Sequence, residues 1–161
     1  MVESSMLMKR PVDIGRVLNE ILRMIKTTFP ETIRVTHNCL PDPGLIYADE
    51  TRIHQVIMNL CTNARHAMSE QGGTLDIRVA PATICPQDEA CSFDLGAGEY
   101  LKISVADTGH GMESDILERA FNPYFTTNNA RGGAGMGLAI VHGIVKDHGG
   151  AIKVVSEPGR L

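Results

Sequence analysis

The sequence predicts an α+β fold in which helices pack against one face of a sheet and form a two-layer sandwich. In several segments apolar residues recur at helical spacing, and in others they alternate with polar residues as they do along strands. Helices and strands are interleaved through hairpin-like joints, which favours two layers around one core. With 161 residues, of which 43% are hydrophobic and 21% charged, the chain is long enough to bury such a core.

Residues 1–10 are expected to be a linker remnant, and residues 11–161 a single domain. A first helix is predicted to begin after Asp13, a favourable N-cap, and to end before Pro30. Its apolar stripe consists of Ile14, Val17, Leu18, Ile21, Leu22 and Ile25. A short strand is expected around Ile33 and Val35, and a proline-rich turn leads to a second short apolar stretch, Leu45–Ala48.

The next helix is predicted to run from the cap residue Asp49 to about Met68. Its core-facing stripe is expected to be Ile53, Val56, Ile57, Leu60 and Ala64. A second, polar stripe follows at spacings of three and four, formed by Arg52, Gln55, Asn59, Asn63 and His66. Asparagine is a poor helix-interior residue because its side chain competes for backbone hydrogen bonds. Two asparagines one turn apart therefore suggest a function.

The second half begins with a strand predicted over Thr74–Ile84 and an irregular loop over 85–98. A strand over Glu99–Asp107 would place Asp107 on the same side as its apolar residues, so a buried carboxylate is expected there. A short helix over 114–120, an irregular stretch over 121–137 and a helix over 138–148 follow. Gly149 and Gly150 are expected to end that helix, and a last strand is predicted over 152–155.

Composition excludes several classes of function. The net charge is −4 and there is no basic block, which argues against nucleic-acid binding. No apolar run approaches the roughly 20 residues that span a bilayer, and the N-terminus lacks a signal-peptide pattern, so no membrane contact is expected. The four cysteines form no CxxC pair and indicate the reduced thiols of a cytoplasmic protein.

Two glycine-containing segments are candidates for nucleotide binding. In Asp107-Thr-Gly109-His-Gly111 the carboxylate would accept from the exocyclic amine of adenine, while the glycines would let a ring approach the backbone. The alternative is a tight turn in which Asp107 bonds its own loop amides. Gly132–Leu138 leads into a helix and would cradle phosphates with its backbone amides, unless it is a surface loop.

Familiar phosphate-binding patterns do not fit this second segment. The dinucleotide fingerprint requires a third glycine where Leu138 stands, and no Lys-Ser/Thr pair follows the glycines as in a Walker A loop. The polar helix stripe supplies what both segments lack, because a carboxamide oxygen is a suitable hard ligand for Mg²⁺. The alternative for any one asparagine is a solvated helix face.

Together these residues resemble the GHKL ATPase superfamily, and within it the histidine-kinase catalytic domain, over nearly all of Val12–Arg160. The stretch from His54 to Ala64 is similar to the N box, and Asp107-Thr-Gly-His-Gly-Met matches the G1 box. The stretch Phe121-Asn-Pro-Tyr-Phe-Thr-Thr is similar to the F box, and Gly133–Leu138 resembles the G2 box. The resemblance implies the Bergerat-type ATP-binding sandwich, a mixed sheet with three helices on one face.

The same resemblance implies ATP and Mg²⁺ as cofactors and assigns residue roles. Asp107 would bind the adenine amine, and Gly109 and Gly111 would let the ring approach. Asn63 would bind Mg²⁺, with Asn59 touching metal or phosphate. The phosphates and lid would involve Phe121, Phe125, Thr126, Thr127, Arg131, Gly133, Gly135, Gly137 and Leu138. Asn128 stands where many relatives have Lys, and Ala134 where many have Thr; weaker triphosphate binding is expected, unless Arg131 compensates.

By resemblance the chain would transfer the γ-phosphoryl of ATP to a histidine on a dimerisation domain, with a response-regulator receiver domain as further partner. None of the six histidines precedes the family's acidic-basic-Pro acceptor pattern, so the acceptor is expected outside this chain. The fragment should then bind ATP without autophosphorylating, in the cytoplasm, in a parent that is free or membrane-anchored. It is also expected to lack the last strand of its relatives. The alternatives are another GHKL kinase of the anti-sigma type, or a degenerate domain that serves only for interaction.

Overall fold

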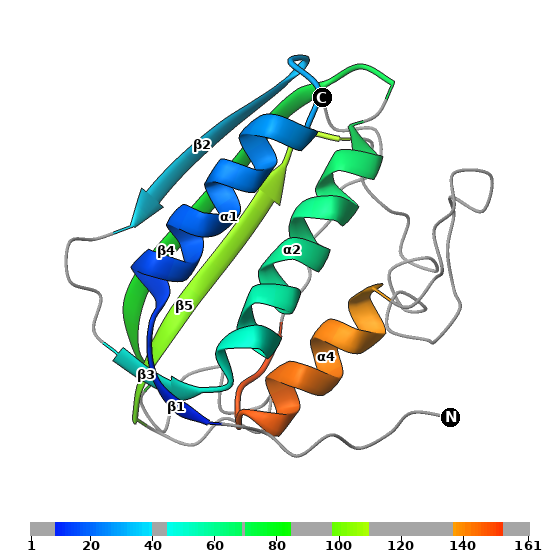
Figure 1. Cartoon of the computed structure of the whole chain (residues 1–161). Helices are drawn as coiled ribbons and strands as arrows, with labels where there is room; N and C mark the ends of the chain where they lie inside the picture. The colour runs from blue at the N-terminus through cyan, green and yellow to red at the C-terminus, as the bar shows by residue number, and fades with distance from the viewer. Residues whose placement is uncertain (1–8, 40–44, 69, 85–97, 110–136, 153–161) are drawn as a thin grey trace.

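The computed structural model has the predicted two-layer α+β architecture, with helices α1, α2 and α4 on one side of the sheet (Figure 1). It describes residues 9–39, 45–68, 70–84, 98–109 and 137–152. The described elements are β1 (Arg10–Asp13), α1 (Ile14–Thr28), β2 (Ile33–Cys39), β3 (Leu45–Ala48), α2 (Glu50–Ala67), β4 (Gly73–Ile84), β5 (Gly98–Asp107) and α4 (Gly137–Asp147).

Helix α1 forms because its cap and its apolar stripe agree. The Asp13 side chain accepts from the Arg16 backbone N–H at 3.4 Å. The six predicted apolar residues of the stripe are all buried. The helix ends at Phe29, whose backbone N–H donates to the Ile25 carbonyl, directly before Pro30. The prediction for this helix is confirmed.

Helix α2 is capped by Asp49, whose side chain accepts from the Arg52 backbone N–H at 3.3 Å. Its buried residues are Ile53, Val56, Ile57, Cys61 and Ala64. Cys61 was not predicted on this face, whereas the predicted Leu60 is only partly buried. The reason is that Leu60 packs in a separate cluster with α4, and Cys61 points into the main core.

The three-stranded sheet has the order β2-β4-β5 and is mixed. Strand β2 runs parallel to β4, with Val35 opposite Leu75, and β5 runs antiparallel to β4, with Asp107 opposite Leu75. Leu75, Ile77 and Val79 alternate along β4 and are fully buried beneath the helices. These three side chains join α1 and α2 in the main hydrophobic core.

The two-stranded ribbon of β1 and β3 is not predicted from the sequence, because a strand of four residues is too short to show a periodic pattern. Arg10 in fact begins β1, which pairs antiparallel with β3 so that Arg10 lies opposite Ala48 and Asp13 opposite Leu45. Val12 and Ala48 are buried, which anchors the ribbon to the main core. Strand β3 leads directly into α2, so the ribbon fixes where that helix begins.

Helix α4 packs against α2 through Val141 and Ile144, which are buried together with Val56. Its C-terminus is closed by two glycines as predicted. Gly149 has φ +72°, and the backbone N–H groups of Gly149 and Gly150 donate to the carbonyls of Lys146 and Val145.

Several predicted elements lie outside the described residues: the loop over 85–97, the helix over 114–120 and the irregular stretch up to 136. In the predicted last strand, Ile152 adopts no regular structure, and residues 153–155 lie outside the described part. Within the described residues, no helix is both long enough and apolar enough to cross a membrane.

Candidate functional site

The polar stripe of α2 places Asn59 and Asn63 one turn apart. Asn59 is partly buried and Asn63 is exposed. No hydrogen bond joins either side chain to another residue in the described part of the chain. The stripe continues from Val56 and Leu60, which pack against α4. Two carboxamides therefore lie next to the α2–α4 contact, and neither has a hydrogen-bond partner in the described part of the chain.

Helix α4 lies beside α2 and runs antiparallel to it (Figure 1). The C-terminal His148 lies at the start of α2, where its Nε2 accepts from the Asp49 backbone N–H at 3.0 Å. Both helices rise by about 1.5 Å per residue. Seven residues along α2 from Asp49 and seven residues back along α4 from His148 bring Val56 level with Val141, which agrees with their packing in one cluster. Ten residues in each direction bring Asn59 level with Leu138. Leu138 is partly buried there, and Gly137 begins the helix.

Asp107 ends β5 with an exposed side chain, which corrects the prediction of a buried carboxylate. Its parity is as predicted, since Leu101, Ile103 and Val105 all pack against the core. Those three side chains are only partly buried, however, because β5 is an outer strand of the described sheet. Asp107 Oδ1 accepts from the Gly109 backbone N–H at 2.8 Å, which is the turn contact considered as the alternative. The second carboxylate oxygen has no hydrogen-bond partner among the described residues.

The turn Asp107–Gly109 is fixed against the C-terminal end of α2. A Cβ added to Gly109 would lie 2.5 Å from the Ala67 carbonyl oxygen, so only glycine allows this approach. The Thr108 hydroxyl accepts from the Thr74 backbone N–H at 3.0 Å and lies 3.9 Å from the sulfur of Met68. Gly109 therefore has a packing role that sequence reasoning did not assign to it.

Three predicted segments thus border the C-terminal half of α2. The turn at Asp107 meets its last residue, Asn63 lies one helical turn before that residue, and the first turn of α4 lies near Asn59. A carboxylate, two carboxamides and the backbone N–H groups of a helix N-terminus are then arranged in order along one helix. Such a row of groups suits an elongated ligand with a hydrogen-bond donor at one end and anionic oxygens at the other.

The remaining predicted site residues lie outside the described residues: Gly111, Phe121, Phe125, Thr126, Thr127, Arg131, Gly133 and Gly135, together with Asn128 and Ala134.

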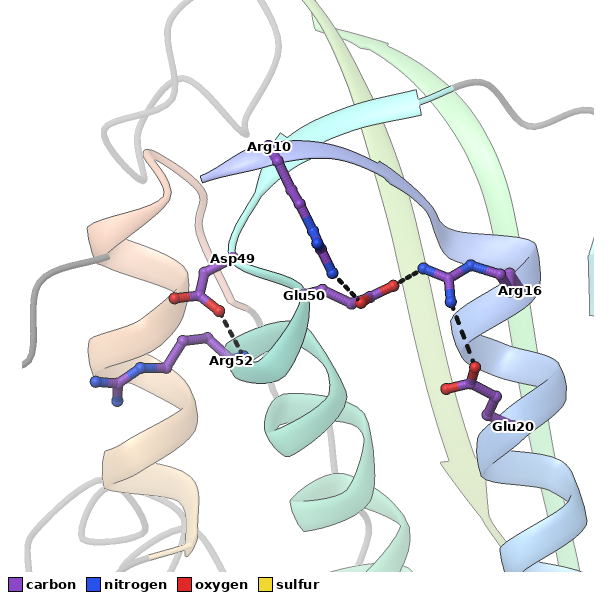
Figure 2. Close-up of polar contacts among 6 residues, drawn as sticks. All are labelled: Arg10, Arg16, Glu20, Asp49, Glu50 and Arg52. Carbon is purple, nitrogen blue, oxygen red and sulfur yellow. Dashed lines mark hydrogen bonds and ion pairs between the residues drawn. The ribbon is translucent and has the colours of Figure 1, made fainter. Parts of the chain in front are cut away.

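The first turn of α2 holds contacts that sequence reasoning missed. The Glu50 carboxylate pairs with Arg10 of β1 at 2.5 Å and with Arg16 of α1, which also pairs with Glu20 at 3.4 Å (Figure 2). Charged residues far apart in sequence gave no signal of this network. For His148, the sequence offers only its place directly before the two helix-ending glycines.

Burial affects the pKa of thiols near α2. It raises the pKa of Cys61 to about 12, because the sulfur lies in the core. The pKa of Cys39 is also raised, first by burial and then by the nearby Asp13 carboxylate. Both cysteines lie outside any disulfide bond in the described part of the chain. Neither is therefore a reactive nucleophile at neutral pH.

Comparison with known proteins gives this geometry a context. The profile of the family described as histidine kinase-, DNA gyrase B-, and HSP90-like ATPase matches residues 48–160. The sensor histidine kinase ZraS of Escherichia coli K12 is 36% identical over 164 residues, covering 99% of this chain and 31% of ZraS. The chain therefore spans less than a third of that relative's length.

Solved structures show the same fold. ShkA, determined at full length in complex with AMPPNP, superposes with a TM-score of 0.73 at 29% identity, covering 99% of this chain and 30% of ShkA. Histidine kinase ThkA, determined in complex with the response regulator TrrA, superposes with a TM-score of 0.64 at 23% identity, covering 89% of this chain and 36% of ThkA. The predicted fold class is confirmed.

Proposed function

The chain belongs to the family of histidine kinase-, DNA gyrase B- and HSP90-like ATPases, and from this premise we propose that it is the ATP-binding catalytic domain of a sensor histidine kinase. The single observation that carries the proposal is the alignment of Asp107, Asn63, Asn59 and the first turn of α4 along one half of α2. The likeness to a sensor histidine kinase over 99% of this chain supports it.

The residues present fit magnesium and a triphosphate. Mg²⁺ prefers hard oxygen ligands and keeps several waters, so it needs few protein donors. The carboxamides of Asn63 and Asn59 have no hydrogen bond to other described residues and are available as such donors. When bound, the metal would neutralise phosphate charge. The chain's own contribution is to orient the nucleotide, since phosphoryl transfer depends mainly on positioning and charge stabilisation.

Individual roles follow from this orientation. One oxygen of the Asp107 carboxylate accepts from the Gly109 backbone N–H. The other oxygen would accept a hydrogen bond from the adenine amine. Gly137 and Leu138 would present backbone N–H groups to the phosphates at the start of α4. We assign lid and phosphate contacts to Gly111, Phe121, Phe125, Thr126, Thr127, Arg131, Gly133 and Gly135 on the resemblance alone.

The complete reaction requires a second domain. A histidine ring nitrogen would attack the γ-phosphorus as the bond to ADP breaks, and the family pattern places that histidine on a helical dimerisation domain. None of the six histidines here carries the acceptor pattern. A response-regulator receiver domain would then accept the phosphoryl group. Because ATP is supplied in the cytoplasm, the domain would act there.

Binding of AMPPNP with Mg²⁺, measured by calorimetry, tests the proposal. Asn63→Ala and Asp107→Asn should each weaken binding by roughly 10- to 100-fold, the usual effect of removing a charged or metal-linked contact. Asn19→Ala is the matched control, because Asn19 is an exposed asparagine on α1, remote from the site. If both site variants bind like the parent chain, the assigned site is wrong.

The same titration separates a degenerate domain from a kinase, and the residue phosphorylated on the partner separates the two kinds of kinase. A degenerate interaction domain, which the Asn128 and Ala134 departures favour, would give no saturable heat with ADP and Mg²⁺. A GHKL kinase of the anti-sigma type would bind nucleotide but phosphorylate serine rather than histidine on its partner.

A further inference from the structure

The contact between α4 and α2 is mostly apolar. Its buried members are Val56, Val141 and Ile144, with Leu60, Ile140, Val145 and Ile152 partly buried around them. Burial of apolar surface is not directional, so it does not by itself select a single position of α4 along α2. A directional contact adds a further constraint on how far α4 extends along α2.

His148 supplies such a contact with both ring nitrogens. Nε2 lies 3.0 Å from the backbone nitrogen of Asp49 and must be the acceptor, because that nitrogen is a donor. The ring proton is therefore on Nδ1, which lies 2.8 Å from the Ile144 carbonyl one turn earlier in α4. The neutral ring thus joins the C-terminus of α4 to the N-cap of α2.

The other end of this contact is itself held firmly. The Asp49 residue is 8% exposed, and its side chain caps α2 through the Arg52 N–H. The next residue, Glu50, pairs with Arg10 and Arg16, which joins the same turn to β1 and α1 (Figure 2). His148 therefore attaches α4 to a turn that is itself held in place by contacts with β1 and α1.

We infer that His148 is a positioning residue of the nucleotide site, an inference that rests on the proposed function. By tying α4 to Asp49, it sets the axial register that brings the phosphate-facing first turn of α4, at Gly137 and Leu138, level with Asn59. That turn lies about 15 Å from His148, at 1.5 Å per residue. A slip of one residue would move it by about 1.5 Å, enough to misalign backbone donors with phosphate oxygens.

Two variants of His148 separate the acceptor from the rest of the ring. Glutamine places an amide oxygen near the position of Nε2 and keeps an acceptor for Asp49. Asparagine keeps a donor near Nδ1 for the Ile144 carbonyl but does not reach Asp49. We expect His148→Asn to weaken AMPPNP·Mg²⁺ binding roughly three- to tenfold, the usual worth of one hydrogen bond, and His148→Gln to stay within about twofold of the parent.

Adenosine is the second probe, because it lacks the phosphates that face α4. Its affinity should not differ between the parent chain and the two variants when all are measured well below their melting temperatures. Hydrogen exchange provides a direct readout: the Asp49 amide should lose protection in His148→Asn and keep it in His148→Gln.

The outcomes are distinct. If the parent chain binds no AMPPNP with Mg²⁺, the proposed function fails and the inference fails with it. If the parent binds but His148→Asn binds equally well, only the inference is overturned. Equal losses for AMPPNP and adenosine, or a glutamine variant as weak as the asparagine variant, would likewise overturn it in favour of a general structural role.

Discussion

Replacing Gly109 by alanine tests the contact between the Asp107 turn and the end of α2. The added Cβ would lie 2.5 Å from the carbonyl oxygen of Ala67, and 2.7 Å from both its carbonyl carbon and its Cβ. All three atoms belong to the last residue of α2, so none is the far end of a flexible side chain. The turn or the helix end has to move.

The expected cost follows from that rigidity. Overpacking a well-filled site usually costs about 1–3 kcal/mol, and a clash with helix backbone belongs in the upper part of that range. We therefore expect Gly109→Ala to lower the free energy of unfolding by about 2–3 kcal/mol. For a domain near 150 residues this lowers the melting temperature by about 4–12 °C.

Thermal and urea unfolding followed by circular dichroism measure this cost, and Gly143→Ala is the matched control. Gly143 lies exposed in α4, and a Cβ there would meet nothing within 4 Å. The same change of hydrogen to methyl should therefore stabilise the chain at Gly143 by about 0.5–1 kcal/mol. Gly109→Ala unfolding at the same temperature as the parent, or both variants shifting in the same direction, would refute the proposed contact.

Two further predictions concern a helix end and a surface carboxylate. Gly149→Ala should destabilise the chain by about 1 kcal/mol in urea unfolding, since φ at Gly149 is +72° while space for a Cβ is open; an unchanged midpoint would contradict the strained-cap account. The pKa of Asp76 is lowered from 3.8, first by the Thr36 hydroxyl and then by Arg78. The ionised carboxylate therefore stabilises the folded chain above pH 3.8, and this stabilisation is lost as the pH falls through the lower pKa of the folded state. The urea midpoint of Asp76→Asn should therefore lie below that of the parent at pH 7 and converge with it on acidification, and a gap that widens at low pH would be inconsistent with this pKa.

Local signals were sufficient for the main helices and strands. Asp13 and Asp49 are N-caps that precede apolar stripes of the correct period, so α1 and α2 were predicted nearly to the residue. Alternation along β4 gave its buried residues in the same way. In each case the information lies within a few neighbouring residues, where propensity and pattern act together.

Elements that depend on distant partners were not predicted. Strand β1 is four residues long, and it exists because it pairs with β3, far along the chain. For a similar reason Leu60 was predicted on the core-facing stripe of α2 and Cys61 was not. Helical periodicity indicates a buried face, but it does not show that a second helix, α4, covers part of α2.

The candidate site was predicted in part. The direction of the Asn59–Asn63 stripe and the start of α4 follow from periodicity. The exposure of Asp107 does not, because strand parity gives the side to which a residue points and not how deeply an outer strand is covered. The contact of His148 with Asp49 joins residues that are 99 positions apart in the sequence, so no local pattern contains it.

A crystal structure of the chain with AMPPNP and Mg²⁺ would test the central claim most directly. The account predicts the adenine amine within hydrogen-bond distance of the Asp107 carboxylate, the metal beside the Asn63 amide oxygen, and the phosphates at the first turn of α4. A nucleotide bound elsewhere, or one whose metal contacts neither asparagine of α2, would contradict it.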